Sequence, residues 1–128
     1  MNPYYGNIEE ETLQNNNFRK VLYTGTHAQL VVMSLNPGED IGMEVHATVD
    51  QFFRIEQGTA KFEIDGQIIE AGPDHAVIVP AGAQHNVTNL SDKTLKLYTI
   101  YSPPNHTEGT IHATKAEADA AEAAEHGE

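Results

Sequence analysis

The sequence contains no cysteine and no tryptophan. The absence of cysteine excludes disulfides, thiolate metal sites, iron–sulfur clusters and cysteine nucleophiles, so nitrogen and oxygen atoms must hold any metal. With 128 residues, of which 39% are hydrophobic, the chain is too short to build a second independent core. The seven histidines are therefore the side chains to follow in the search for a site.

Basic side chains are scarce. Seven Lys and Arg residues stand against nineteen Asp and Glu residues, which gives a formal net charge of −12. This charge repels phosphate backbones and anionic lipid surfaces, so we expect neither a nucleic-acid nor a membrane partner. The acidity lies mostly at the two ends, because residues 1–17 carry a net charge of −3 and residues 102–128 a net charge of −5.

Long apolar runs are missing as well. The longest, near residues 30–35, is far shorter than the roughly 20 residues that span a bilayer. The first six residues have neither the basic region nor the apolar region of a secretory signal. We therefore expect a cytoplasmic protein.

Short β-type runs separated by turn residues begin at Phe18, a pattern typical of a small all-β sandwich or barrel. Asp65-Gly66 predicts a two-residue hairpin, because both residues tolerate the positive φ of a type I′ turn. The expected strands are 18–23, 29–35, 42–47, 51–56, 59–64, 67–69, 76–79, 85–89 and 95–101.

The two ends differ from this β-rich middle. Residues 1–17 predict an irregular arm or a short edge element. Thr114-Lys115-Ala116-Glu117 fits a capping box, and the alanine-rich run that follows favours a helix, which either packs on the barrel or frays. We therefore divide the chain into an N-terminal arm (1–17), a barrel (18–104), and a C-terminal loop with an acidic, Ala-rich helix (105–128).

Two segments resemble the paired motifs of the cupin superfamily. Residues 37–58 resemble the first motif, G(X)5HXH(X)3,4E(X)6G, and residues 80–89, Pro-Ala-Gly-Ala-Gln-His-Asn-Val-Thr-Asn, resemble the second, PXG(X)2H(X)3N. The chain is thereby identified as a small single-domain cupin of the type-2 conserved-barrel kind, similar to mannose-6-phosphate isomerase. The resemblance implies an all-β double-stranded β-helix (jelly-roll) barrel, a metal in its wider mouth and a homodimer.

The first motif departs from the family pattern at two of its ligand positions. Its first histidine falls on Glu44, its second on His46 and its glutamate on Gln51, while the histidine of the second motif falls on His85. Compared with the usual cupin ligands, this set therefore keeps one carboxylate, which has moved to another strand, and has one histidine fewer.

The period of a β-strand supports the same set of ligands. Glu44 and His46 are two residues apart and share one face of a strand, and a barrel brings its inward faces together. Two imidazoles and a carboxylate suit divalent zinc, manganese or iron, and Gln51 adds a neutral oxygen. We expect a metal on Glu44, His46, Gln51 and His85. The alternatives are that Gln51 only orients a ligand or a bound water, and that the protein has lost the metal and only binds ligands.

Other side chains are weaker candidates. Tyr101 should point inward, where it either acts as a general acid or substrate donor or packs in the barrel, and Lys96 should face the solvent. His106 and His112 flank a turn-rich stretch that is a candidate lid over the mouth, although loop histidines are usually without chemistry. Surface positions are expected for the remaining histidines: His27, His75 and His126.

The favoured function is a metal-dependent enzyme that acts on a small oxygenated molecule, in particular a sugar or sugar-phosphate isomerase with Glu44 and Tyr101 as catalytic residues. The only cations near the motifs in sequence are Arg54 and Lys61, which favours a neutral or carbonyl substrate over a phosphorylated one. The alternatives are an Fe(II)-dependent oxygenase and a non-catalytic small-molecule-binding barrel, because one fold hosts all three.

Overall fold

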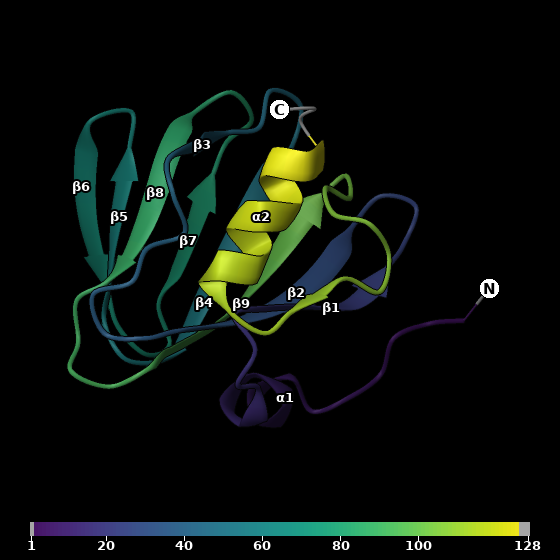
Figure 1. The fold of residues 1–128 in the computed structure, drawn as a ribbon, viewed down its shortest axis with the longest axis horizontal. Coiled ribbons are helices and arrows are strands. Elements are labelled where there is room, and N and C mark those ends of the chain that lie inside the picture. The colour runs from purple at the N-terminus through teal and green to yellow at the C-terminus, as the bar shows by residue number, and fades with distance from the viewer. Residues whose placement is uncertain (1, 126–128) are drawn as a thin grey trace.

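Two antiparallel sheets face each other and enclose the core (Figure 1). The computed structural model describes residues 2–125. One sheet has the strand order β10-β1-β2-β9-β4-β7 and the other β3-β8-β5-β6. In chain order, the elements are α1 (Ile8–Gln14), β1 (Arg19–Thr24), β2 (Gln29–Leu35), β3 (Glu44–Val45), β4 (Asp50–Gln57), β5 (Ala60–Ile64), β6 (Gln67–Ala71), β7 (Ala76–Val79), β8 (Gln84–Asn89), β9 (Leu95–Ser102), β10 (Ile111–His112) and α2 (Lys115–Glu125).

Alternating apolar residues of both sheets fill the space between them. Phe53 and Ile55 of β4, Phe62 of β5 and Val87 of β8 are almost completely buried. The rings of Phe53 and Phe62 meet edge to face, with their centroids 5.1 Å apart, and so join the two sheets. Burying side chains of this size contributes about 1.5–3 kcal/mol each. The predicted all-β barrel is confirmed.

The predicted hairpin is also confirmed. Asp65 and Gly66 have φ values of 48° and 85°, and Ile64 pairs with Gln67 across the turn. Gly58, which ends the first motif, has a φ of 88°, and a Cβ there would lie 3.2 Å from the Cα of Leu95. A residue without a side chain is therefore required at this close approach.

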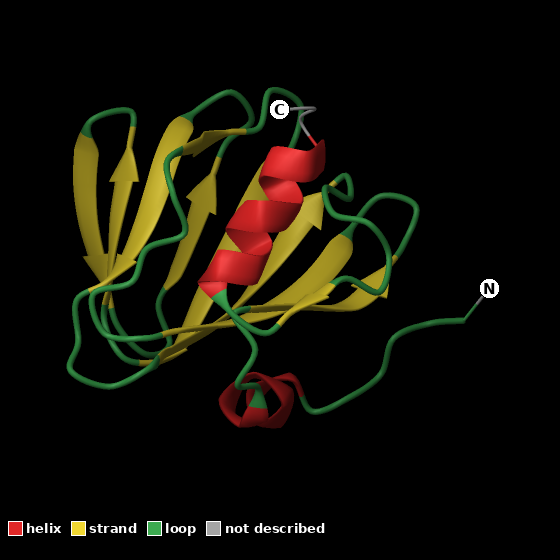
Figure 2. Ribbon diagram, viewed as in Figure 1, coloured by secondary structure: helices red, strands yellow, loops and turns green. Residues whose placement is uncertain are grey.

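The N-terminal arm contains a helix, contrary to the irregular or edge element that its sequence predicts. Asn7 caps α1, because its Oδ1 accepts a hydrogen bond from the Glu10 amide at 3.1 Å. The helix lies outside the barrel (Figure 2), and its C-terminal end covers Lys96. Lys96 was predicted to face the solvent but is buried, and its Nζ donates to the Asn15 carbonyl oxygen and to Asn16 Oδ1.

The C-terminal helix packs on the barrel. Thr114 Oγ1 accepts a hydrogen bond from the Glu117 amide at 3.1 Å, as expected for the predicted cap. Ala118 is buried, and Lys115 Nζ lies 3.2 Å from a carboxylate oxygen of Asp40. In Figure 1, α2 crosses in front of the opening between the sheets. Among the described residues, no helix combines the length and the apolar composition needed to cross a membrane.

Candidate metal centre

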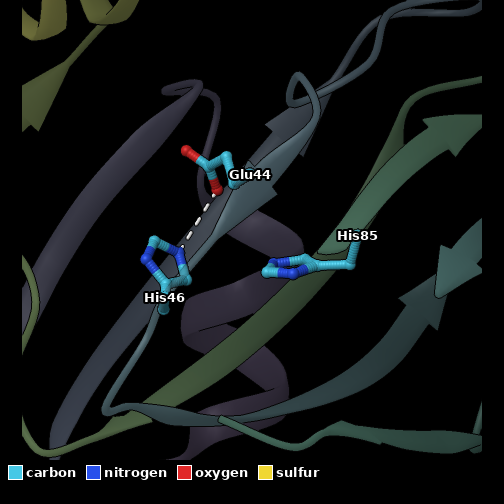
Figure 3. Close-up of side chains that lie close together, drawn as sticks. All are labelled: Glu44, His46 and His85. Atoms are coloured by element: carbon cyan, nitrogen blue, oxygen red, sulfur yellow. Dashed lines mark ion pairs between the residues drawn. The ribbon is translucent and has the colours of Figure 1, made fainter. Parts of the chain in front are cut away.

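Three of the predicted ligands converge at the mouth of the barrel (Figure 3). Glu44 of β3 lies directly opposite His85 of β8 in the antiparallel ladder, and His46 follows β3. One donor atom from each of the three side chains lies within 4.8 Å of the others. Glu44 Oε1 is 3.4 Å from His46 Nε2. The strand register therefore brings together residues that the two motifs contribute separately.

The protonation of the two histidines leaves a nitrogen of each directed at this cluster. His85 Nδ1 lies 3.1 Å from the Ala83 carbonyl oxygen, which can only accept, so Nδ1 carries the proton and Nε2 has a free lone pair. His46 Nε2 is buried and, apart from its 3.4 Å contact with Glu44 Oε1, makes no hydrogen bond to any described residue. An unsatisfied buried ring nitrogen is unfavourable unless it binds a ligand or an ion.

The carboxyl group of Glu44 is held in its charged form. Burial raises its pKa, but the contact with His46 and the charge of Arg19 outweigh burial, so the pKa lies below its ordinary value. A carboxylate must be deprotonated to coordinate a metal. The Glu44 side chain therefore has the required form at neutral pH.

Gln51 is buried on β4, directly opposite Tyr101 of β9. Its Nε2 donates to Thr99 Oγ1 at 3.0 Å, while its Oε1 is buried without a hydrogen-bond partner among the described residues. With the nitrogen on the side of Thr99, the oxygen is the open end of the amide. Gln51 as a fourth ligand stays a prediction.

A cavity of about 370 Å³ opens beside Glu44 and His46. Its walls come from β1, from the loop before β10 and from α2, which contributes Ala118 and Ala121. His106 and His112, predicted near a lid, both line this cavity, although His112 lies on a short strand rather than in a loop. His27 and His75 are exposed, as predicted, and His126 lies outside the described residues.

Tyr101 lies behind His106 rather than in the cavity wall. Its hydroxyl is 3.2 Å from His106 Nε2, and its ring centroid is 5.9 Å from that of His46. Burial raises the pKa of Tyr101 to about 12 and lowers the pKa of His106 to about 3. Both side chains are consequently neutral at physiological pH.

Gln29 of β2 fixes the loop that carries His106. Its Oε1 accepts from the amides of Asn105 and His106 at 3.1 and 2.9 Å, and its Nε2 donates to the His106 carbonyl at 2.7 Å. No sequence pattern indicates this role, because Gln29 has the appearance of an ordinary polar residue at the start of a strand.

Arg19 is a cation at the cavity. Its separation along the chain from both motifs gives no indication of this position. Arg54 pairs instead with Asp74, with Nη2 and Oδ1 2.9 Å apart, and Lys61 lies 3.8 Å from Glu63. Arg19 precedes both motifs in sequence, and the pairing of β1 with β10 places it at the mouth.

Comparisons with known proteins agree with this geometry. A family model described as "Cupin domain" matches residues 31–101. An uncharacterized protein of Bacillus subtilis (strain 168), YrkC, is 51% identical over 127 residues, which cover 94% of this chain and 68% of that protein. The crystal structure of BH2720 from Bacillus halodurans is 45% identical, with a TM-score of 0.91, and the match covers 93% of this chain and 95% of that chain. Mannose-1-phosphate guanylyltransferase of Escherichia coli (strain K12) is 30% identical over 78 residues, 61% of this chain and 16% of that enzyme.

Proposed function

This chain belongs to the cupin family, and from that premise we propose that it is a metal-dependent enzyme acting on a small oxygenated molecule. The favoured reaction is the isomerisation of a sugar or sugar phosphate. The observation that carries the proposal is the convergence of Glu44, His46 and His85 beside a cavity. The partial likeness to mannose-1-phosphate guanylyltransferase is consistent with a sugar-related substrate.

The residues present fit a divalent ion. Two imidazoles and one carboxylate form a ligand set that zinc, manganese and iron accept. Two buried electron-pair donors, His46 Nε2 and Gln51 Oε1, have no hydrogen-bond partner among the described residues. A cation at the cluster of Glu44, His46 and His85 would give His46 Nε2 a partner. When bound, the metal supplies Lewis acidity that polarises a substrate carbonyl.

Proton movement is assigned to the side chains around the ion. Isomerisation removes a proton from the carbon beside the carbonyl and returns it to the neighbouring carbon. Glu44, ionised at the cavity, is the base that takes this proton and gives it back. His106 lines the cavity and donates a hydrogen bond to the carbonyl oxygen as negative charge develops there. The proton of the hydroxyl group on the neighbouring carbon passes to that oxygen, so that one carbonyl and one hydroxyl group are regenerated.

Tyr101 acts through His106 as a positioning residue. A phenol is a stronger acid than a neutral imidazole, so the Tyr101 hydroxyl donates to His106 Nε2 across the 3.2 Å contact. His106 then carries its own proton on Nδ1. Direct contact of Tyr101 with the substrate, as the sequence suggested, is replaced in this proposal by control of the His106 tautomer.

The metal assignment is tested by elemental analysis of protein purified without a histidine tag. We expect close to one equivalent of zinc, manganese or iron in the wild type, and its loss from His46→Ala and His85→Ala, because each removes a ligand. His75→Ala, at an exposed position, is the matched control and should retain the metal. A full equivalent in both of the first two variants would overturn the assignment.

Activity is tested with the metal-loaded protein on mannose and mannose 6-phosphate, by following interconversion with the matching ketoses. We expect turnover that disappears in His85→Ala and persists in His75→Ala. Absence of turnover on both substrates, with the metal in place, would contradict isomerisation of these sugars.

An Fe(II)-dependent oxygenase is the second candidate, because two histidines and one carboxylate are the ligand set of that class. It predicts that iron is the metal and that substrate-dependent oxygen uptake follows loading with Fe(II). If the wild type instead purifies without any metal, the remaining candidate is a non-catalytic barrel that binds small molecules.

A further inference from the structure

A buried cation at the cavity has no acid at ion-pair distance among the described residues. Arg19 begins β1, is 6% exposed and lines the cavity beside Glu44 and His46. Within residues 2–125, none of the ion pairs closer than 4.0 Å includes Arg19. Its Nε is buried without a hydrogen-bond partner among these residues. Glu44, the acid whose pKa the charge of Arg19 lowers, is not within ion-pair distance. A buried guanidinium without an acid in direct contact is unfavourable in the protein alone, and an anionic ligand reduces this penalty.

Neighbouring groups hold the guanidinium in place. Arg19 lies directly opposite His112 in the ladder between β1 and β10, and its Nη1 is 3.4 Å from His112 Nδ1. Its guanidinium carbon lies 5.3 Å from the centroid of the Phe18 ring, within the range of a cation–π contact. These contacts restrict the side chain, so little conformational entropy remains to be lost when a ligand binds.

We propose that Arg19 binds an anionic group of the substrate, a carboxylate or a phosphate, while the metal end of the site binds its oxygenated part. The inference rests on the proposed function for the metal end only. The guanidinium offers five donors in a planar fork, which matches the paired oxygens of both anions. A cavity of about 370 Å³ falls within the range of small-ligand pockets.

Two acids that also line the cavity do not prevent anion binding. Glu44 is the ligand whose charge the metal offsets. Glu122 is exposed on α2, where water and salt screen its charge. The expectation of a neutral substrate, which rested on Arg54 and Lys61, is therefore replaced by an anionic one.

Calorimetric titration of the metal-loaded protein with matched probes tests the inference. Glycolate and glycolamide have nearly the same shape and differ in the charge of one group, and fructose 6-phosphate differs from fructose by one phosphate group. We expect the wild type to bind at least one anionic probe about tenfold or more tightly than its neutral partner. The carboxylate and phosphate arms identify which anion the site takes. Equal affinity within both pairs would overturn the inference.

Variants at Arg19 locate the effect. Arg19→Gln should lose about tenfold or more in affinity for the anionic probe, with affinity for the neutral probe and metal content unchanged. Lys20→Gln, the same change at the next residue, should bind like the wild type. Arg19→Lys keeps the charge but not the fork and should fall between the two. Wild-type anion affinity in both Arg19 variants, or loss of the metal from them, would contradict a substrate-binding role.

This design separates the two proposals. If Arg19→Gln keeps its metal and the wild type binds both members of each pair equally, the anion site is wrong and the metal centre stands. If the wild type contains no metal but still discriminates through Arg19, the metal-dependent function is wrong and the anion site stands.

Discussion

Individual side chains around the cavity have pKa values that differ from those in water. Tyr101 and His106 form a neutral hydrogen-bonded pair whose pKa values burial moves apart, to about 12 and about 3. The first value keeps a proton on the phenol at any physiological pH. The second keeps the imidazole uncharged even in mild acid. A pair of this kind can orient a proton without itself becoming charged.

The low pKa of His106 predicts that the protein loses stability in acid. The unfolded chain takes up a proton on this histidine near pH 6.5, whereas the folded protein resists protonation down to about pH 3. Stability from this group is complete above pH 6.5 and falls as the pH drops toward 3. Between pH 7 and pH 5, the group should lower the free energy of unfolding by about 2 kcal/mol.

Urea denaturation at these two pH values checks this prediction. His106→Gln retains a partner for Tyr101 but cannot titrate. The decrease in its free energy of unfolding between pH 7 and pH 5 should therefore be smaller than that of the wild type by about 2 kcal/mol. His75→Gln, at an exposed position, should behave like the wild type. If the free energy of unfolding falls equally in the wild type and in His106→Gln, His106 is not the group that causes the loss of stability in acid.

The positioning role of Tyr101 predicts a specific spectroscopic change. In Tyr101→Phe, the donor to His106 Nε2 is gone, so the ring should populate both tautomers, which the ¹⁵N chemical shifts of the imidazole report. We expect kcat for the isomerisation to fall about tenfold with KM and metal content unchanged. A variant with unaltered ¹⁵N shifts and unaltered kcat would assign Tyr101 to packing alone.

Sequence reasoning at this scale succeeded where spacing determines geometry. Glu44, His46 and His85 follow from two motifs and the period of a strand, and the structure brings them together. Arg19 and Gln29 were missed because their roles depend on contacts between distant segments. Arg19 reaches the cavity through the pairing of β1 with β10, and Gln29 of β2 binds the loop at His106. No local pattern encodes a pairing of that kind.

Among the elements, the strands were predicted more successfully than the helix before them. The ranges 29–35 and 76–79 agree with the structure, and β4 and β9 differ only at their ends. Helix α1 and strand β10 were missed because both are short and depend on tertiary contacts rather than on apolar periodicity. The division of the chain at residues 17 and 104 remains a prediction.

Lys96 links α1 to the barrel and yields a prediction about stability. Burial lowers the pKa of Lys96, and its Nζ is the partner of the Asn15 carbonyl and of Asn16 Oδ1 at the end of the helix. Lys96→Ala leaves these acceptors unsatisfied, so we expect a loss of about 1–3 kcal/mol in the free energy of unfolding. Urea denaturation measures it, with the exposed Lys93→Ala as the control. Equal stability of the two variants would mean that α1 does not depend on this contact.

For the whole molecule, the outer face of the six-stranded sheet carries a row of apolar side chains. Phe52 of β4 lies between Ile78 of β7 and Ile100 of β9 in the strand register, and Ile78 is 64% exposed. An exposed apolar row of this kind is typical of an interface. We therefore expect the homodimer to form through this sheet.

Analytical ultracentrifugation tests this expectation. Ile78→Glu should shift the protein from dimer to monomer, because it places a charge within the contact. Ile68→Glu, on β6 of the other sheet and also exposed, should leave the dimer intact. A wild-type monomer, or a dimer that tolerates Ile78→Glu, would exclude this interface.

The wall that α2 gives to the cavity consists largely of alanine. Ala118 and Ala121 both line the space beside Glu44 and His46. Ala118 also belongs to the buried core, whereas Ala121 is only partly buried. Exchanges at Ala121 can therefore change the shape of the cavity while Glu44, His46 and His85 and the packing between the sheets stay as they are.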